Sequence, residues 1–267
     1  MTAPIITLTT DFGVQSQGIS SMEGTIAKIA PDARVIHLMH GLPDFDIRSG
    51  ARTMEALYYM PIGYHVCVVD PGVGTSRKPI IIELKRGDYL IGPDNGVLIP
   101  AVGFLGGFKK IVEITNSQFM LLPLSPIFHG RHIFAPAAAY LSIGIPIEKF
   151  GPTLNFNQLV PAPYQEAVIK NGKIEAEVIH INKFGSIILN ILHSTWDKFY
   201  IKHRQTVKVT AEGQTITMAF VETFGQVKAG QSLILKDDFG RMEVAINLGN
   251  FTKKYKTKVG DQIIIIK

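Results

Sequence analysis

The sequence contains a single cysteine, Cys67, and only 18% of its 267 residues are charged. One thiol excludes an internal disulfide framework and a cysteine-based zinc cluster, and it favours a reducing compartment, so we expect a cytoplasmic protein. Cys67 stands in the apolar run His-Val-Cys-Val-Val, which is typical of a buried, unreactive thiol. A chain of this length with 46% hydrophobic residues can bury a full core.

Long hydrophobic runs are also absent. Uncharged stretches such as residues 133–147 are shorter than the roughly 18 to 20 apolar residues that a membrane-spanning helix needs, and this one contains Pro136 and Pro146. The first residues lack a basic segment and lead directly into a strand-like run, so no classical signal peptide is predicted. We therefore expect no membrane partner.

The familiar phosphate-loop, dinucleotide-binding, zinc-protease and serine-hydrolase signatures are missing. The formal net charge of +5 lies entirely in the C-terminal part, because residues 1–163 hold 12 basic and 12 acidic side chains and residues 164–267 hold 15 and 10. A basic run there, Lys253, Lys254, Lys256 and Lys258 around Tyr255, is more typical of a solvated loop or edge strand than of a nucleic-acid surface. No nucleic-acid partner is predicted.

The first 150 residues alternate short β-branched runs with amphipathic stretches, which predicts an α/β domain with a central, largely parallel sheet between helices. The predicted strands are residues 4–9, 35–38, 66–69, 80–84 and 89–91, and the predicted helices are residues 19–29, 47–59 and 131–141.

After Pro161-Ala-Pro163 the pattern changes to short β-rich segments. They are residues 166–169, 174–181, 187–191, 206–210, 215–220, 233–236, 242–246 and 262–267, and Asn171-Gly172 is a type I′ hairpin signal between the first two. We predict an α/β catalytic domain over residues 1–163 and a small all-β barrel domain over residues 164–267.

Three predicted strands end in an acidic residue followed two positions later by glycine, at Asp11, Asp70 and Asp94. Each could be ordinary turn chemistry. Because ligands gather outside the carboxyl ends of parallel strands, the repetition indicates a polar site at that edge.

Asp70 and Arg77 flank a glycine-rich loop that can bring their side chains together, and His129 stands just before a predicted helix. Taken singly, an Asp-Arg pair is more often a structural salt bridge, and a histidine is more often a satisfied core or surface residue. The residues alone leave both interpretations open.

Several motifs together carry a resemblance. They are TDFG (10–13), MEG (22–24), VDPGVGT (69–75) with Arg77, PDNGVL (93–98), FHGRHIFAP (128–136), KFG (183–185) and GRMEVAIN (240–247). Through these motifs the chain resembles the S-adenosyl-L-methionine (SAM) hydroxide adenosyltransferase family, which is related to fluorinase and chlorinase. The resemblance covers nearly the whole chain and implies an N-terminal α/β domain followed by a small β-barrel.

The resemblance implies hydrolysis of SAM to adenosine and L-methionine, with Asp70, Arg77 and His129 as the catalytic set and water, not halide, as the nucleophile. It implies a homotrimer with the ligand between the N-terminal domain of one subunit and the C-terminal domain of the next. The reaction requires no metal and no cofactor.

Substrate-binding positions carry over in the same way. Asp11 matches the carboxylate that binds the ribose hydroxyls, and Phe45, Phe128 and Phe184 match aromatic walls around ribose and adenine. The remaining implied positions are Phe12, Val73, Gly130, Asn182, Ser186, Asp238 and Val244.

The chain departs from the family pattern where the amino-acid end of SAM binds. Ser16 and Gly18 replace an aspartate and a tyrosine, Asn182 and Ser186 replace an aspartate and an asparagine, and Asp237-Asp238 replaces Asn-Ser. Two alternatives therefore stay open: a hydrolase of another 5′-substituted adenosine, and a non-catalytic protein that binds adenosine or SAM.

Overall fold

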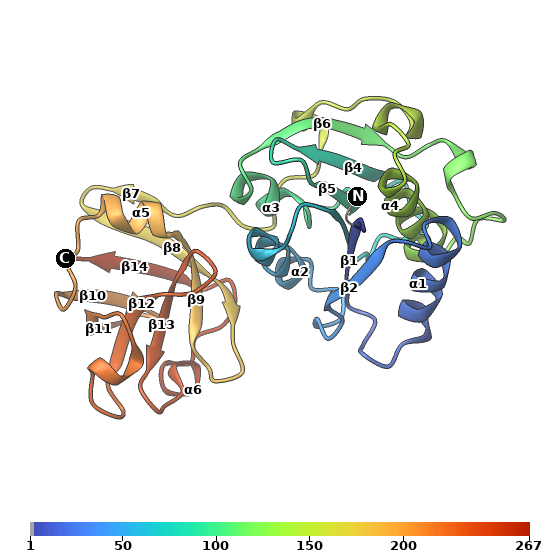
Figure 1. The fold of residues 1–267 in the computed structure, drawn as a ribbon. Coiled ribbons are helices and arrows are strands. Elements are labelled where there is room, and N and C mark those ends of the chain that lie inside the picture. The colour runs from blue at the N-terminus through green and yellow to red at the C-terminus, as the bar shows by residue number, and fades with distance from the viewer. Residues whose placement is uncertain (1–2) are drawn as a thin grey trace. The chain divides into compact units, whose positions relative to one another are not determined.

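The computed structural model describes residues 3–267 and divides the chain into two units, Met1–Pro163 and Tyr164–Lys267 (Figure 1). Each unit has its own hydrophobic core. The division falls at the Pro-Ala-Pro segment where the sequence pattern changes.

A six-stranded sheet with the order β2-β1-β3-β5-β4-β6 forms the centre of the first unit. Its strands are β1 (Ile5–Thr10), β2 (Arg34–Met39), β3 (Tyr64–Val68), β4 (Pro79–Leu84), β5 (Tyr89–Pro93) and β6 (Phe108–Glu113). The pairs β2–β1, β1–β3 and β3–β5 are parallel, and β4 is antiparallel to both of its neighbours. The prediction of parallel strands is confirmed for these neighbours, and their carboxyl ends share one edge of the sheet.

Helices cover both faces of this sheet (Figure 1). Side chains alternate along β3, so that Val66 and Val68 pack with α1 (Gln17–Ile29) and α4 (Ala135–Ser142), whereas Cys67 packs with α2 (Ile47–Met54) and α3 (Ile99–Phe104). The Cys67 thiol is fully buried, and burial raises its pKa, which agrees with an unreactive core residue.

Two predicted helices are less regular than expected. The predicted helix 47–59 is α2 followed by the 3₁₀-helix η1 (Glu55–Tyr59), and the helix predicted from residue 131 begins with the π-helical turn η3 (Gly130–Phe134) before α4. Pro136 has no N–H to donate to the carbonyl of His132 four residues earlier. That carbonyl instead accepts a hydrogen bond from Leu121 N at 2.8 Å, which ties the preceding segment to the helix.

The second unit is a barrel closed by the pairing of β14 with β8. Its seven strands are β8 (Lys173–Ile181), β9 (Ile187–Leu192), β10 (Thr206–Ala211), β11 (Gln214–Phe220), β12 (Ser232–Lys236), β13 (Arg241–Ile246) and β14 (Gln262–Ile266). β7 (Val168–Lys170) pairs only with β8, through a hairpin whose residues Asn171 and Gly172 have φ of 51° and 72°, as a type I′ turn requires.

Short helices complete the chain. They are α5 (His193–Lys198), α6 (Phe251–Tyr255) and the 3₁₀-helices η2 (Ser117–Phe119), η4 (Ile147–Phe150), η5 (Phe156–Gln158) and η6 (Phe224–Gln226). Within residues 3–267, no helix has the length and hydropathy needed to cross a membrane.

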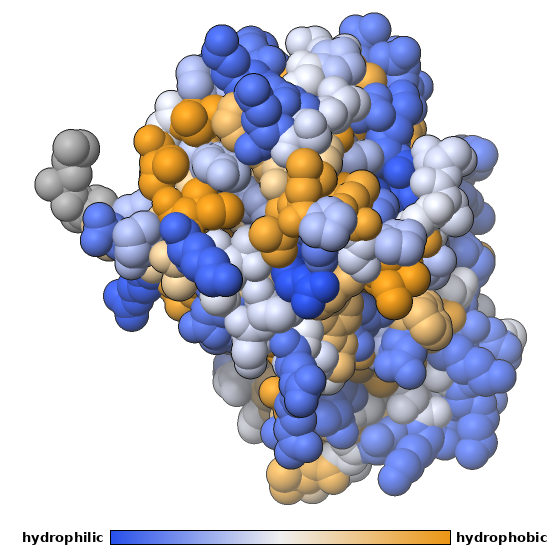
Figure 2. All heavy atoms as spheres, turned by 90° about the vertical axis from the view of Figure 1, so that its right-hand side faces the viewer, coloured by the Kyte–Doolittle hydropathy of each residue, from blue (hydrophilic) through white to orange (hydrophobic). Residues whose placement is uncertain are grey.

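The face of the first unit that carries α1 and α4 exposes apolar patches between polar side chains (Figure 2). Leu121, Leu122, Leu124 and Ile127 are exposed, and Ile127 is 79% accessible. They belong to the segment that leads into Phe128 and His129.

Candidate active site

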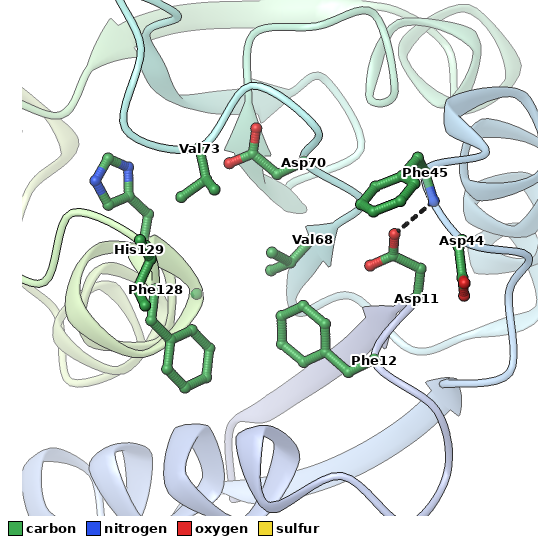
Figure 3. A pocket seen from close by; sticks show the side chains of 11 residues that line it. Asp11, Phe12, Asp44, Phe45, Val68, Asp70, Val73, Phe128 and His129 are labelled. Carbon is green, nitrogen blue, oxygen red and sulfur yellow. Dashed lines mark hydrogen bonds between the residues drawn. The ribbon is translucent and has the colours of Figure 1, made fainter.

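A cleft of about 250 Å³ opens at the carboxyl ends of β1 and β3 (Figure 3). It is lined by Asp11, Phe12, Asp44, Phe45, Val68, Asp70, Val73, Ile127, Phe128, His129 and Gly130. The two parallel strands therefore deliver Asp11 and Asp70 to the same cleft from positions 59 residues apart, as the strand-end pattern predicts.

Asp70 is held by Arg77 across the glycine-rich loop that follows β3. Arg77 Nε donates to Asp70 Oδ1 at 3.0 Å and to Oδ2 at 2.9 Å, and Arg77 Nη2 also donates to Oδ2. Both side chains are more than nine-tenths buried. The guanidinium stacks 5.2 Å above the Phe134 ring, and its Nη1 is buried without a hydrogen-bond partner among the described residues. This packing fixes the Asp70 carboxylate in one orientation.

Arg77 also joins His129 to the carboxylate. Arg77 Nη2 lies 2.7 Å from His129 Nδ1, and because a guanidinium only donates, Nδ1 must be the acceptor. Burial and the adjacent Arg77 charge lower the pKa of His129, so the ring is neutral at pH 7. A neutral ring with an unprotonated Nδ1 carries its proton on Nε2.

Asp11 is fixed from the other side of the cleft. Its Oδ2 accepts a hydrogen bond from Phe45 N at 2.9 Å, and its second oxygen points into the cleft (Figure 3). Phe45 has a φ of 62° and is 69% exposed, so the backbone turns sharply here to present its N–H to the carboxylate. Asp46, the next residue, caps α2 by accepting from Ser49 N at 3.0 Å.

Two aromatic side chains form a wall of the cleft. The Phe12 and Phe128 rings meet edge to face with centroids 5.6 Å apart, and the Arg131 guanidinium lies 5.0 Å over the Phe128 ring. This wall and the carboxylates give the cleft one apolar side and one anionic side.

The structure thus brings together, within the first unit, the residues of that unit that the resemblance implies for the site: Asp11, Phe12, Phe45, Asp70, Val73, Arg77, Phe128, His129 and Gly130. Asp94, the third strand-end aspartate, does not line the cleft. Its Oδ1 accepts from Val160 N at 2.9 Å, so it anchors the segment before the second unit. Asp44, Val68 and Ile127 also line the cleft and were not predicted, although each is adjacent or close in sequence to a predicted residue.

The predicted residues of the second unit gather around the β8–β9 turn and β13. Asn182 Oδ1 accepts from Phe184 N at 3.0 Å and from Ser186 N at 3.1 Å, and its Nδ2 donates to Glu243 Oε1 at 3.3 Å. Burial and the nearby Asp237 and Asp238 raise the pKa of Glu243, a residue of the 240–247 motif that was not predicted for the site.

The other predicted residues of the second unit differ in exposure. Phe184 is 66% exposed and the Lys183 ammonium lies 5.0 Å over its ring, while Asp238 is exposed in the turn before β13. Val244 is different, because the whole residue is buried in the barrel core and β13 pairs there with β12 on one side and β9 on the other. The prediction that Val244 contacts a ligand is therefore not supported by its place in the barrel. Across residues 3–267, no group of three or more His, Cys, Asp or Glu side chains is arranged to hold a metal ion.

Comparison with known proteins assigns the family. The model of the SAM hydroxide adenosyltransferase N-terminal domain matches residues 6–151, and that of the C-terminal domain matches residues 176–264. The chain belongs to the SAM hydroxide adenosyltransferase family.

Relatives of this chain match nearly its whole length. An (R)-S-adenosyl-L-methionine hydrolase of Salinispora tropica is 34% identical over 97% of both chains, and one of Methanocaldococcus jannaschii is 31% identical over 98% of this chain and 95% of its own. A fluorinase of Actinoplanes is 22% identical over 99% of this chain and 98% of its own. An uncharacterized conserved protein from Thermotoga maritima superimposes with a TM-score of 0.91 at 33% identity, covering 98% of this chain and 100% of that one.

Two of the residues that depart from the family pattern have local structural roles. Ser16 is the N-cap of α1, and its hydroxyl accepts from Gly18 N at 3.1 Å. A Cβ atom on Gly18 would lie 3.1 Å from Phe12 Cδ2 and 3.3 Å from Phe128 Cζ. A tyrosine at this position would therefore require the aromatic wall to move.

Proposed function

We propose that this protein hydrolyses SAM to adenosine and L-methionine by attack of water on the ribose C5′ carbon. The observation that carries the proposal is the hydrogen-bonded set of Asp70, Arg77 and His129 in the same cleft as Asp11. The curated relatives named as SAM hydrolases, at 31–35% identity over nearly the full length, support it.

The reaction makes simple demands on the protein. Water forms the new C5′–O bond and loses a proton, while the C5′–S bond breaks and the sulfonium leaves as the neutral thioether of methionine. A neutral leaving group needs no acid, so the protein must supply a water in line with the C–S bond and an acceptor for its proton. Neither step requires a metal or a cofactor.

Asp70 is the proton acceptor in this proposal. Arg77 holds the carboxylate in position through Nε and Nη2, and it leaves the remaining lone pairs of Asp70 for the water. His129 engages Arg77 through Nδ1 and carries its own proton on Nε2. It therefore contributes by orienting Arg77, and Asp70 takes the proton from water.

Asp11 binds the ribose in this proposal. One carboxylate oxygen is held by Phe45 N and the other points into the cleft, an arrangement that suits two vicinal hydroxyls. Phe12 and Phe128 pack against the nucleoside, and Val73 and Gly130 complete the cleft wall.

We further propose that Asn182, Phe184, Ser186 and Asp238 bind the adenine and methionine ends from a neighbouring subunit of a homotrimer. The exposure of Phe184 and Asp238 and the exposed apolar side chains of residues 121–127 support an assembly of this kind. We place the reaction in the cytoplasm, because a fold that uses no internal disulfide and buries its one cysteine is typical of a reducing compartment.

A second candidate is the hydrolysis of another 5′-substituted adenosine. Ser16 favours it, because its hydroxyl caps α1 where the family pattern has a carboxylate for the α-amino group of methionine. Calorimetric titration with SAM and with 5′-methylthioadenosine separates the two. Tighter binding of the compound that lacks the amino-acid tail would support the second candidate.

Purified protein incubated with SAM should release adenosine and L-methionine in equal amounts, and Asp70→Ala and His129→Ala should each turn over SAM more slowly by about a hundredfold or more. Asp94→Asn is the matched control, since it alters a strand-end aspartate outside the cleft and keeps an oxygen for Val160 N. Equal turnover in all four proteins would overturn the proposal. Adenosine binding without turnover in the wild type would identify a non-catalytic binding protein.

A further inference from the structure

Asp11 lies in a turn that follows the last residue of β1 paired with a neighbouring strand. β1 pairs with β2 up to Thr9–Met39 and with β3 up to Thr10–Val68, so the backbone of residues 11–13 has no strand partner. A carboxylate on such a turn keeps its direction only if other groups hold the turn.

His40, the first residue after β2, holds that turn at two points. Its backbone carbonyl accepts from Gly13 N at 2.8 Å, and its Nδ1 lies 2.9 Å from the hydroxyl of Thr10. The same hydroxyl accepts from Phe12 N at 3.3 Å. The hydroxyl of Thr10 therefore links the residues on both sides of Asp11, because it contacts His40 and accepts from Phe12 N. The hydrogen bond from Gly13 N to the His40 carbonyl fixes the end of the turn.

The two side chains that hold the turn, Thr10 and His40, are buried, and both make further hydrogen-bond contacts. Thr10 is 0% exposed and His40 is 8% exposed. The second ring nitrogen of His40, Nε2, lies 2.8 Å from Nδ1 of His37, whose own Nε2 lies 3.6 Å from Glu23 on α1. A chain of side chains therefore joins the Asp11 turn to helix α1 on the same face of the sheet.

We infer that His40 and Thr10 are positioning residues for ribose recognition and act by fixing the direction of the Asp11 carboxylate. Neither side chain lines the cleft, so neither touches the ligand. The inference rests on the proposed role of Asp11. It assigns His40 a function that is separate from the chemistry at Asp70.

Thr7 provides a matched control in the same strand. Its hydroxyl lies 3.0 Å from Nδ1 of His65, it is also 0% exposed, and it lies three residues before Thr10 in β1, outside the cleft lining. Thr7→Val and Thr10→Val therefore remove the same kind of buried threonine–histidine contact. Only Thr10→Val should weaken the binding of adenosine.

The test is calorimetric titration with adenosine and with 2′,3′-dideoxyadenosine. We expect Thr10→Val, His40→Ala and Asp11→Asn each to weaken adenosine binding about tenfold, the size of one hydrogen bond to a charged group. Binding of the dideoxy compound, which has no hydroxyls for Asp11, should stay unchanged. Thr10→Ser and His40→Asn should restore most of the affinity, because serine keeps the hydroxyl and asparagine keeps an acceptor one bond beyond Cγ.

Three results would overturn the inference. The first is that Thr10→Val and His40→Ala bind adenosine as tightly as the wild type does. The second is that they bind adenosine and the dideoxy compound more weakly by the same factor. The third is that Thr7→Val weakens adenosine binding alone, as expected for Thr10→Val. A wild type that binds both nucleosides equally, with Asp11→Asn unchanged, would instead overturn the Asp11 assignment in the proposed function.

Discussion

Arg77 Nη2 and His129 Nδ1 lie 2.7 Å apart, and this contact assigns the proton of His129 to Nε2. A histidine in that state has no free lone pair for a water proton. In the proposed mechanism this contact gives the three residues separate roles: Asp70 accepts the proton, Arg77 holds Asp70 in position, and His129 holds Arg77.

The His129 assignment predicts different effects for two substitutions. His129→Asn keeps an acceptor near the place of Nδ1 and should retain kcat within about tenfold, whereas His129→Ala should lower kcat about a hundredfold. Steady-state kinetics on both variants checks this. Equal loss in both would indicate that His129 is itself the base, and ¹⁵N NMR of the wild type should find the ring proton coupled to Nε2.

Asp70→Asn should slow turnover strongly and leave substrate binding unchanged. Asparagine has nearly the size of aspartate but is a far weaker base, so kcat should fall about 10²- to 10⁴-fold, the usual contribution of a positioned base. KM should change little, because Asp70 does not bind the nucleoside in this account. A KM that rises as steeply as kcat falls would place Asp70 in substrate binding instead.

Gly74→Ala should damage both stability and catalysis. Gly74 has a φ of 77°, and an added Cβ would lie 2.5 Å from the carbonyl oxygen of Pro126, in the segment before His129. Strain and displacement should lower the free energy of unfolding by about 1 to 3 kcal/mol and reduce kcat by separating Arg77 from His129. Thermal melts and kinetics measure the two effects.

Gly144→Ala is the control for Gly74→Ala. Gly144 also has a positive φ, 93°, but an added Cβ would meet nothing within 4 Å. It should cost about 1 kcal/mol of stability and leave kcat unchanged. Loss of activity in Gly144→Ala as well would show that strain alone, and not the contact with Pro126, lowers the rate.

His40 should make stability depend on pH below neutrality. Burial and the neighbouring His37 lower the pKa of His40 to about 4, so the folded state favours the neutral ring. Its contribution is fully present above the unfolded pKa of about 6.5 and is lost as the pH falls toward 4, by up to about 3 kcal/mol. The difference in unfolding free energy between wild type and His40→Asn should therefore shrink from pH 7 to pH 4; a constant difference would contradict this.

Much of the fold follows from local pattern, and the exceptions have physical causes. β1, β3 and β5 are buried on both faces, so their apolar runs are plain in the sequence. β6 begins Phe-Lys-Lys at the sheet edge, where exposed charges hide the strand pattern, and the six residues of α3 are too few to establish a helical period. Closure of the barrel depends on β14 pairing with β8, more than 80 residues earlier, which no local pattern encodes.

The side chains that meet in the cleft could be predicted where motifs contain them, and not where their contacts depend on packing. Asp70 and Arg77 are seven residues apart in one loop, and the motif that contains His129 supplied the side chain that contacts Arg77. His40 was missed, because its role depends on the place where β2 stops beside the Asp11 turn. Glu243 was missed because its burial against Asn182 arises only when β13 pairs with β9.

The central claim is that the oxygen of water becomes the 5′-oxygen of adenosine. Incubation of the purified protein with SAM in ¹⁸O-labelled water, followed by mass spectrometry of both products, tests it most directly. The account predicts one ¹⁸O atom in the 5′-hydroxyl of adenosine and none in L-methionine. Adenosine without the label, a different nucleoside product, or no turnover of SAM would contradict it.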